Sequence, residues 1–142
     1  MQRMLPPINN ALPDITSRFG AVEGRPSGSS KPHRGIDFNY LGKDQINRSH
    51  PVVRAPVTGT VTKVNPNKWG MISIRDADGL SHEILHTHSQ YVAVGDPVAA
   101  GQIIGSMGNT GLVRETPEDG VHVHYQLRDP AGNVLNPTAF FD

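Results

Sequence analysis

Clusters of turn-forming residues divide this 142-residue chain into segments too short for ordinary helices. Glycine, proline, asparagine and aspartate mark turns because they tolerate or preset the backbone angles that a turn needs. The runs between the clusters are rich in valine and isoleucine, and none shows an amphipathic helical pattern free of glycine and proline. This pattern predicts an antiparallel all-β fold with little helix. The clusters lie at residues 65–67, 76–79, 95–97, 108–111 and 129–133.

Composition is that of a single folded domain, and it excludes several classes of function. The 13 basic residues balance the 13 acidic residues, so no excess positive charge indicates a nucleic-acid surface. No cysteine is present, which excludes disulfides, thiolate zinc sites and a cysteine nucleophile. No apolar run approaches the roughly 18 residues of a membrane helix, and the first residues lack the apolar core of a signal peptide. We expect residues 1–14 to form an extended N-terminal arm and residues 15–142 a single domain.

Two histidines lie two residues apart in the run of residues 121–128, which alternates like a strand. Strand side chains alternate between faces, so the odd positions, such as Val123 and Tyr125, are predicted to face the core. His122 and His124 then share the other face, roughly 7 Å apart. Both could reach one metal ion, or one could bind it while the other acts on a substrate. The alternative is a pair of surface histidines on a solvated face.

His33 and Asp37 form a second candidate pair. Pro32 and Gly35 disfavour a helix here, and on an ideal strand the two side chains would stand about 13 Å apart, too far for one zinc ion. A bend at Gly35 would bring them together, because glycine permits unusual backbone angles. Imidazole and carboxylate are ordinary zinc ligands, and with a third ligand from elsewhere they leave one position open. The alternative is a loop histidine and an aspartate that caps a turn.

Residues 82–86 match the His-Glu-x-x-His motif, whose two histidines bind zinc from one face of a helix. The surrounding turns and strand-like runs favour a strand instead. As a strand, this segment would place His82, Ile84, His86 and His88 on one face.

Together these segments resemble the lysostaphin/LytM-type zinc endopeptidases, β-lytic metallopeptidases that cut peptide bridges in bacterial peptidoglycan. The resemblance runs from Ile15 to Phe141 and keeps the order of the family's motifs. All four family histidines and the aspartate are present. The matching segments are Ile15–Gly20, His33–Phe38, Val53–Val61, His86 followed by Gly95-Asp96, Gly101–Gly105, Gly108–Gly111 and His122–His124.

The resemblance implies that His33, Asp37 and His124 hold one Zn²⁺ per chain, with water in the open position. His86 and His122 would be the catalytic pair, one as general base and the other as donor to the oxyanion, in either order. The implied fold is an antiparallel two-sheet domain with an open groove. The implied function is zinc-dependent hydrolysis of peptide cross-links or stem peptides of peptidoglycan, and both a D-Ala–diaminopimelate bond and a glycine bridge fit.

The chain departs from the family pattern at several positions. The tyrosine that commonly lies two residues before the isolated histidine is replaced by Ile84, and Tyr40 is a candidate to supply the missing hydroxyl. His88 stands where the family usually has a small polar residue, which predicts a histidine-rich rim. His50 is expected to be solvent-exposed. Two loops are longer than usual, residues 41–51 and residues 112–120.

Other functions and the biological setting stay open at this point. The main alternative is a non-catalytic LytM-like binding or activator module. Residues 55–61 and 94–102 also resemble biotinyl and lipoyl carrier domains, but the hairpin at residues 106–109 lacks their lysine. The implied partner is a peptidoglycan peptide, with no nucleic acid and no membrane span, and a cognate inhibitor or export machinery is left open. Action in the periplasm or at the cell wall would require another export route, a phage origin or a longer parent protein.

Overall fold

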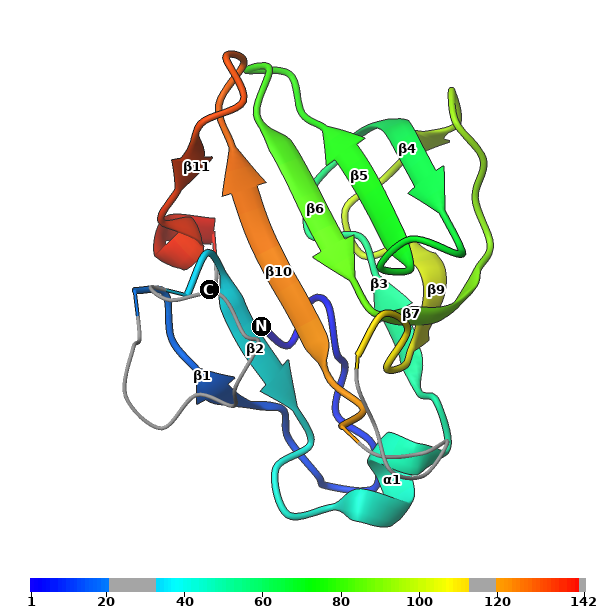
Figure 1. Cartoon of the computed structure of the whole chain (residues 1–142). Coiled ribbons are helices and arrows are strands. Elements are labelled where there is room, and N and C mark those ends of the chain that lie inside the picture. The colour runs from blue at the N-terminus through cyan, green and yellow to red at the C-terminus, as the bar shows by residue number, and fades with distance from the viewer. Residues whose placement is uncertain (21–32, 113–119, 141–142) are drawn as a thin grey trace.

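Two antiparallel sheets form the framework of the described part of the protein, and the all-β two-sheet prediction is confirmed (Figure 1). The computed structural model describes residues 1–20, 33–112 and 120–140. The larger, eight-stranded sheet has the order β1-β2-β10-β6-β5-β4-β8, with β11 also paired to β10, and the smaller has the order β3-β9-β7. The strands are β1 (Asp14–Ser17), β2 (Ile36–Asn39), β3 (Val52–Arg54), β4 (Gly59–Asn65), β5 (Met71–Arg75), β6 (Ser81–Leu85), β7 (Thr87–Gln90), β8 (Pro97–Val98), β9 (Ile103–Met107), β10 (Val123–Arg128) and β11 (Val134–Leu135).

Helix is limited to short pieces in the described part of the chain. The five-residue α1 (Asp44–Arg48) lies within the loop of residues 41–51, and a 3₁₀ turn, η1 (Pro137–Phe140), follows β11. Asn47 closes this loop, because its side chain hydrogen-bonds both the backbone N–H and the carbonyl of Tyr40 at 3.0 Å. None of the described helices has the length and apolar character needed to span a membrane.

The side chains of the central strand β10 alternate between an apolar face and a polar face of the large sheet, as predicted from the sequence. Side chains at the odd positions of residues 121–127 are at most 4% exposed, and Val121, Val123 and Tyr125 belong to a core shared with the smaller sheet. The even positions, His122, His124, Gln126 and Arg128, lie on the opposite face. The candidate site therefore lies on the polar face of the sheet, directly over a packed core.

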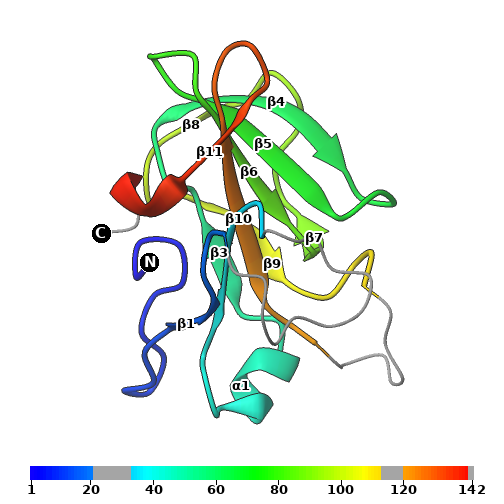
Figure 2. The same ribbon diagram turned by 60° about the vertical axis from the view of Figure 1, so that its left-hand side comes forward.

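The N-terminal residues pack against the smaller sheet and the end of β2 (Figure 2). Met4 and Leu5 are buried in the core, and the Met4 carbonyl accepts a hydrogen bond from the backbone N–H of Arg54 at 2.9 Å. Ile8 and Ala11 form an isolated β-bridge that reverses the chain. The division between an arm and a domain after residue 14 stays a prediction.

Candidate functional site

A bend immediately before β2 brings His33 next to Asp37. His33 Nε2 lies 3.2 Å from Asp37 Oδ1, whereas a straight strand would hold the two side chains about 13 Å apart. Glycine at position 35 permits the bend's close packing, because a Cβ there would collide with the carbonyl oxygen of Tyr125 and lie 2.9 Å from His124 Nε2. The bend thus brings two candidate ligands together and seats them against β10.

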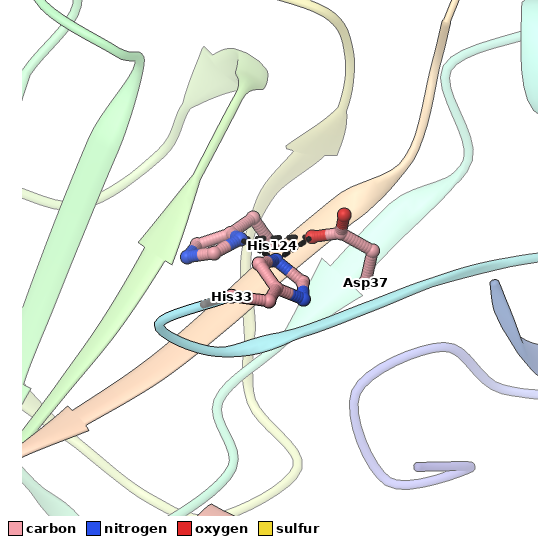
Figure 3. A group of neighbouring side chains, drawn as sticks. All are labelled: His33, Asp37 and His124. Carbon is pink, nitrogen blue, oxygen red and sulfur yellow. Dashed lines mark hydrogen bonds and ion pairs between the residues drawn. The ribbon is translucent and has the colours of Figure 1, made fainter. Parts of the chain in front are cut away.

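The third candidate ligand comes from β10, which pairs with β2 so that His124 lies opposite Asp37 (Figure 3). His124 Nδ1 lies 2.8 Å from Asp37 Oδ1 and 3.2 Å from His33 Nε2. In a tetrahedral zinc site with bonds of about 2.0–2.1 Å, ligand atoms stand about 3.3 Å apart. The spacing of the three atoms therefore suits one zinc ion.

Hydrogen bonds outside the cluster fix which ring nitrogen faces its centre. His33 Nδ1 lies 3.1 Å from the Arg18 carbonyl, which can only accept, so this nitrogen donates and Nε2 keeps its lone pair. His124 Nε2 lies 2.7 Å from Gln126 Oε1 and donates likewise, which leaves a lone pair on Nδ1. Lone pairs of two nitrogens and a carboxylate this close repel one another unless a cation or a proton lies between them. The donor set fits zinc in its chemistry as well as in its spacing.

The surroundings of Asp37 favour its deprotonated form, the carboxylate. Burial raises the pKa of this carboxyl, but His124, His33 and His122, which can hold a proton beside it when no metal is bound, outweigh burial. The net effect holds the pKa of Asp37 well below its usual range. Metal binding requires this deprotonated form.

His122 and His86 lie beside the three candidate ligands. His122 Nε2 is 3.6 Å from Asp37 Oδ1, and the rings of His86 and His122 are 5.0 Å apart between centroids. His86 Nδ1 donates to the Thr110 carbonyl at 2.8 Å, and His122 Nδ1 donates to the Gly120 carbonyl at 2.6 Å. Both rings therefore keep Nε2 for proton exchange at the site.

Burial also sets the protonation state of these two histidines. It lowers the pKa of His86 to about 3, and charge repulsion from His122 contributes. Burial lowers the pKa of His122 as well, although Asp37 opposes the shift. Both rings are thus neutral at pH 7, and their proximity disfavours protonation of both at once.

A break in strand geometry turns His86 toward the site. The prediction that His82 and His86 share one face is wrong: the His82 ring packs against Tyr125 on the core face, whereas the His86 ring faces His122. The cause is the left-handed backbone of His86, with φ of 69°, between β6 and β7. Its N–H donates to the carbonyl of Trp69 at 2.6 Å, which secures this conformation.

The helical zinc motif at residues 82–86 is excluded, because this segment is a strand followed by the irregular His86. His82 is completely buried. Its Nδ1 lies 2.6 Å from the Tyr125 hydroxyl and its Nε2 lies 2.8 Å from Asp76 Oδ2, so neither nitrogen is available to a metal.

Two expectations about neighbouring residues need correction. Tyr40 cannot supply a hydroxyl to the site, because it is fully buried and its hydroxyl donates to the Pro6 carbonyl at 2.5 Å; burial raises its pKa to about 12. His50 is half-buried rather than fully exposed, with its ring stacked 3.7 Å from that of the exposed His88. Its Nδ1 donates to the Met107 carbonyl at 2.9 Å. Of the long loop at residues 112–120, residues 113–119 lie outside the described part.

Sequence reasoning missed the groups that orient the candidate residues. The carbonyls of Thr110 and Gly120 give no side-chain signal, since any residue supplies one. Gln126 was detectable, because it shares a strand face with His124. Glu83 emerges only from the pairing of β6 with β10, which places it opposite Gln126.

The polar face continues beyond Gln126 into a pocket of about 370 Å³. Arg128 and Glu83 line its end near the candidate site, and Arg75 and Asp129 add exposed or half-buried charges. The lining of this pocket is largely polar and contains none of the five candidate residues.

Comparison with known proteins places this arrangement in a family. The model of peptidase family M23 matches residues 31–137, which include all five candidate residues. The chain belongs to peptidase family M23. Over 116 residues, 80% of this chain and 24% of the relative, it is 28% identical to the peptidoglycan DD-endopeptidase ShyC of Vibrio cholerae. It therefore spans about a quarter of the length of this curated relative.

Solved structures show the same family fold. LytU is 30% identical with a TM-score of 0.66, and the match covers 89% of this chain and 82% of LytU. The catalytic domain of the antimicrobial peptidase lysostaphin from Staphylococcus simulans is 26% identical with a TM-score of 0.68, covering 93% of this chain and 92% of that one. The resemblance to lysostaphin/LytM-type peptidases expected from the sequence is thus confirmed.

Proposed function

We propose that this M23 protein is a zinc-dependent endopeptidase that hydrolyses peptide cross-links or stem peptides of bacterial peptidoglycan. The observation that carries the proposal is the convergence of one atom each from His33, Asp37 and His124, all within 4.8 Å of one another. The family membership supports peptidase activity. The similarity to ShyC, described as a peptidoglycan DD-endopeptidase, supports the substrate class.

His33, Asp37 and His124 would hold the ion, through Nε2, Oδ1 and Nδ1 respectively. When bound, zinc lowers the pKa of water toward neutrality and polarises the scissile carbonyl. The protein itself would hold these three atoms together on the polar face of the sheet. The hydrogen bonds of His33 to Arg18 and of His124 to Gln126 keep the lone pairs of the two ring nitrogens directed at the ion.

Proton transfer falls to the two remaining histidines. We assign proton acceptance to His122, because its Nε2 lies 3.6 Å from Asp37 Oδ1 and is unprotonated when Nδ1 donates to Gly120. His86 Nε2 carries no proton while Nδ1 donates to Thr110, so it would first take over the proton that His122 has accepted and then present it to the developing oxyanion. The 5.0 Å ring separation lets one proton be held between the pair while repulsion disfavours two.

A peptidoglycan substrate implies action in the periplasm or at the cell wall. The polar pocket beyond Gln126 offers charged and hydrogen-bonding groups for a peptide, as expected of a substrate rich in carboxylates and amides. Both a D-Ala–diaminopimelate bond and a glycine bridge remain compatible with this surface.

The test is zinc content by elemental mass spectrometry together with the loss of turbidity of purified peptidoglycan, for the wild type and His124→Ala. We expect one zinc per wild-type chain and lysis, both lost in the variant. Zinc without lysis of either bond type would favour the non-catalytic binding module. A wild-type protein that lyses walls without metal would overturn the mechanism.

A further inference from the structure

A buried chain of hydrogen bonds leads from the candidate metal site along the polar face of the large sheet. His124 Nε2 lies 2.7 Å from Gln126 Oε1, and Gln126 Nε2 donates to Glu83 Oε1 at 2.6 Å. Arg128 Nε donates to the same Glu83 oxygen at 2.6 Å. Glu83 is 2% exposed and Gln126 is 6% exposed, so water competes little for these bonds.

Glu83 determines which group donates and which accepts in each of these hydrogen bonds. A carboxylate paired with Arg128 only accepts hydrogen bonds, so the amide NH₂ group of Gln126 must face Glu83. The Gln126 oxygen then faces His124 and also only accepts. His124 must therefore carry its proton on Nε2, which leaves the lone pair on Nδ1.

The opposite arrangement would defeat metal binding. If the Gln126 amide turned over, its oxygen would oppose the Glu83 carboxylate, and its NH₂ group would require a lone pair on His124 Nε2. The proton of the neutral His124 ring would then lie on Nδ1, the atom 2.8 Å from Asp37 Oδ1. That tautomer cannot donate an electron pair from Nδ1 to a metal.

We propose that Glu83 is a positioning residue for the metal site and that it acts through Gln126 to hold His124 in the tautomer protonated on Nε2. The inference rests on the proposed function in that it takes His124 as a zinc ligand. It also gives a role to the glutamate of the 82–86 sequence match: Glu83 acts from a strand, on a histidine of the neighbouring strand. Loss of such an outer contact typically weakens metal affinity 10–100-fold.

Two variants separate this role from simple packing. Glu83→Gln keeps the size of the side chain but presents either an oxygen or an NH₂ group to Gln126, so the Gln126 amide is free to turn over. The exchange variant Glu83→Gln/Gln126→Glu restores the order of donors and acceptors, because a carboxylate at 126 accepts from His124 and from the new amide at 83. Asp76→Asn is the matched control, a carboxylate-to-amide change beside His82 on the other face of the sheet.

The measurements are the tautomer of His124 from ¹⁵N NMR of the metal-stripped protein and the zinc dissociation constant from competition with a chelator. For Glu83→Gln we expect a mixture of tautomers and zinc binding weakened about 10–100-fold. The exchange variant should recover the wild-type tautomer and most of the affinity, and Asp76→Asn should change neither.

An unchanged tautomer in Glu83→Gln would overturn the proposal, and so would a loss of affinity that the exchange variant fails to relieve. If the wild type bound no zinc, the proposed function would fail, while the tautomer measurement would still decide the role of Glu83. If zinc bound as expected but no wall was lysed, only the catalytic part of the proposed function would fail.

Discussion

Two clusters of histidine and aspartate lie on opposite faces of β6 and β10, and they differ in what their ring nitrogens do. The first is the site cluster, formed by the five candidate residues of the functional site. The second is the buried triad, formed by Asp76, His82 and Tyr125. In the triad, His82 uses both nitrogens on its two neighbours, at 2.6 and 2.8 Å. In the site cluster, each histidine uses one nitrogen on a group outside the cluster and turns the other inward. The site cluster consists of His33, Asp37, His86, His122 and His124.

The difference shows that residue type alone does not make a metal or catalytic site. Asp76 also caps a turn, since its Oδ1 accepts from the N–H groups of Asp78 and Leu80, so the triad has a complete structural explanation. The site cluster instead holds lone pairs close together without satisfying them among themselves. Such an arrangement costs stability unless a cation is bound, which is typical of a functional site.

Removal of an inward-facing ligand should give the largest effect. We expect His33→Ala to abolish zinc binding and to lower peptidoglycan hydrolysis at least roughly 10³-fold, because several kcal/mol of transition-state stabilisation are lost. His82→Ala, the matching change in the buried triad, should retain one zinc per chain. Elemental analysis and turbidity assays on both folded variants make the comparison. Equal zinc loss in the two variants would show that the clusters do not differ as described.

The next effect separates ligands from proton-transfer groups within the site cluster. His122→Ala and His86→Ala should keep zinc and each lose roughly 10²–10⁴-fold in kcat, the usual contribution of general acid–base catalysis. The double variant should lose less than the product of the two, because the residues act on one proton transfer. Steady-state kinetics on a soluble cross-link peptide, with zinc content measured in parallel, tests this. Zinc loss in either single variant would make that residue a ligand instead.

The sequence predicted the parts of the site that follow regular geometry. Alternation along β10 placed His124 away from the core because this strand keeps its period without a break. The bend at Gly35 was one of two possibilities, because Pro32 and Gly35 disfavour a helix and a straight strand would hold the two side chains too far apart for one zinc ion. Regular alternation failed at His86, because its positive φ depends on a hydrogen bond to Trp69, a contact between distant segments. No local pattern encodes such a contact.

The outer contacts of the site were beyond sequence reasoning for the same reason. Glu83 meets Gln126 only because β6 and β10, separated by more than 30 residues, pair in one register. His50 was predicted to be exposed, but its stacking on His88 depends on how its loop folds over the end of β9. Pairing and loop placement are long-range outcomes, so the residues that tune the site are harder to predict than those that form it.

Crowding at Gly35 should give a smaller effect, still specific to the site cluster. A Cβ in Gly35→Ala would collide with the Tyr125 carbonyl and push on His124, so we expect weaker zinc binding together with a loss of stability of about 1–3 kcal/mol. Gly59→Ala is the control, because its Cβ would be equally crowded by the Arg75 carbonyl at a distance from the site. Zinc titration and chemical denaturation should show a stability loss in both variants and weaker zinc binding in Gly35→Ala alone. Normal zinc affinity in Gly35→Ala would mean that His124 moves freely.

The smallest effect is the pH dependence of the buried triad. Burial lowers the pKa of His82, although Asp76 opposes the shift; burial raises the pKa of Asp76, but hydrogen bonds from His82 and the turn lower it overall. Both groups bind protons more readily in the unfolded chain, so both contribute stability that is lost as pH falls.

Replacement of the histidine should therefore flatten the stability profile. His82→Leu should cost about 1–3 kcal/mol at pH 7.5, because the Tyr125 hydroxyl loses its partner. The difference from the wild type should shrink as pH falls below about 6.5, the usual histidine pKa. Urea denaturation of both proteins between pH 5 and pH 7.5, with zinc removed, measures the contribution of His82 to the free energy of unfolding without any contribution from metal binding. A difference in stability that stays constant across this range would indicate that His82 stabilises the fold by packing alone. Its hydrogen bonds to Asp76 and Tyr125 would then make no contribution to stability that depends on protonation.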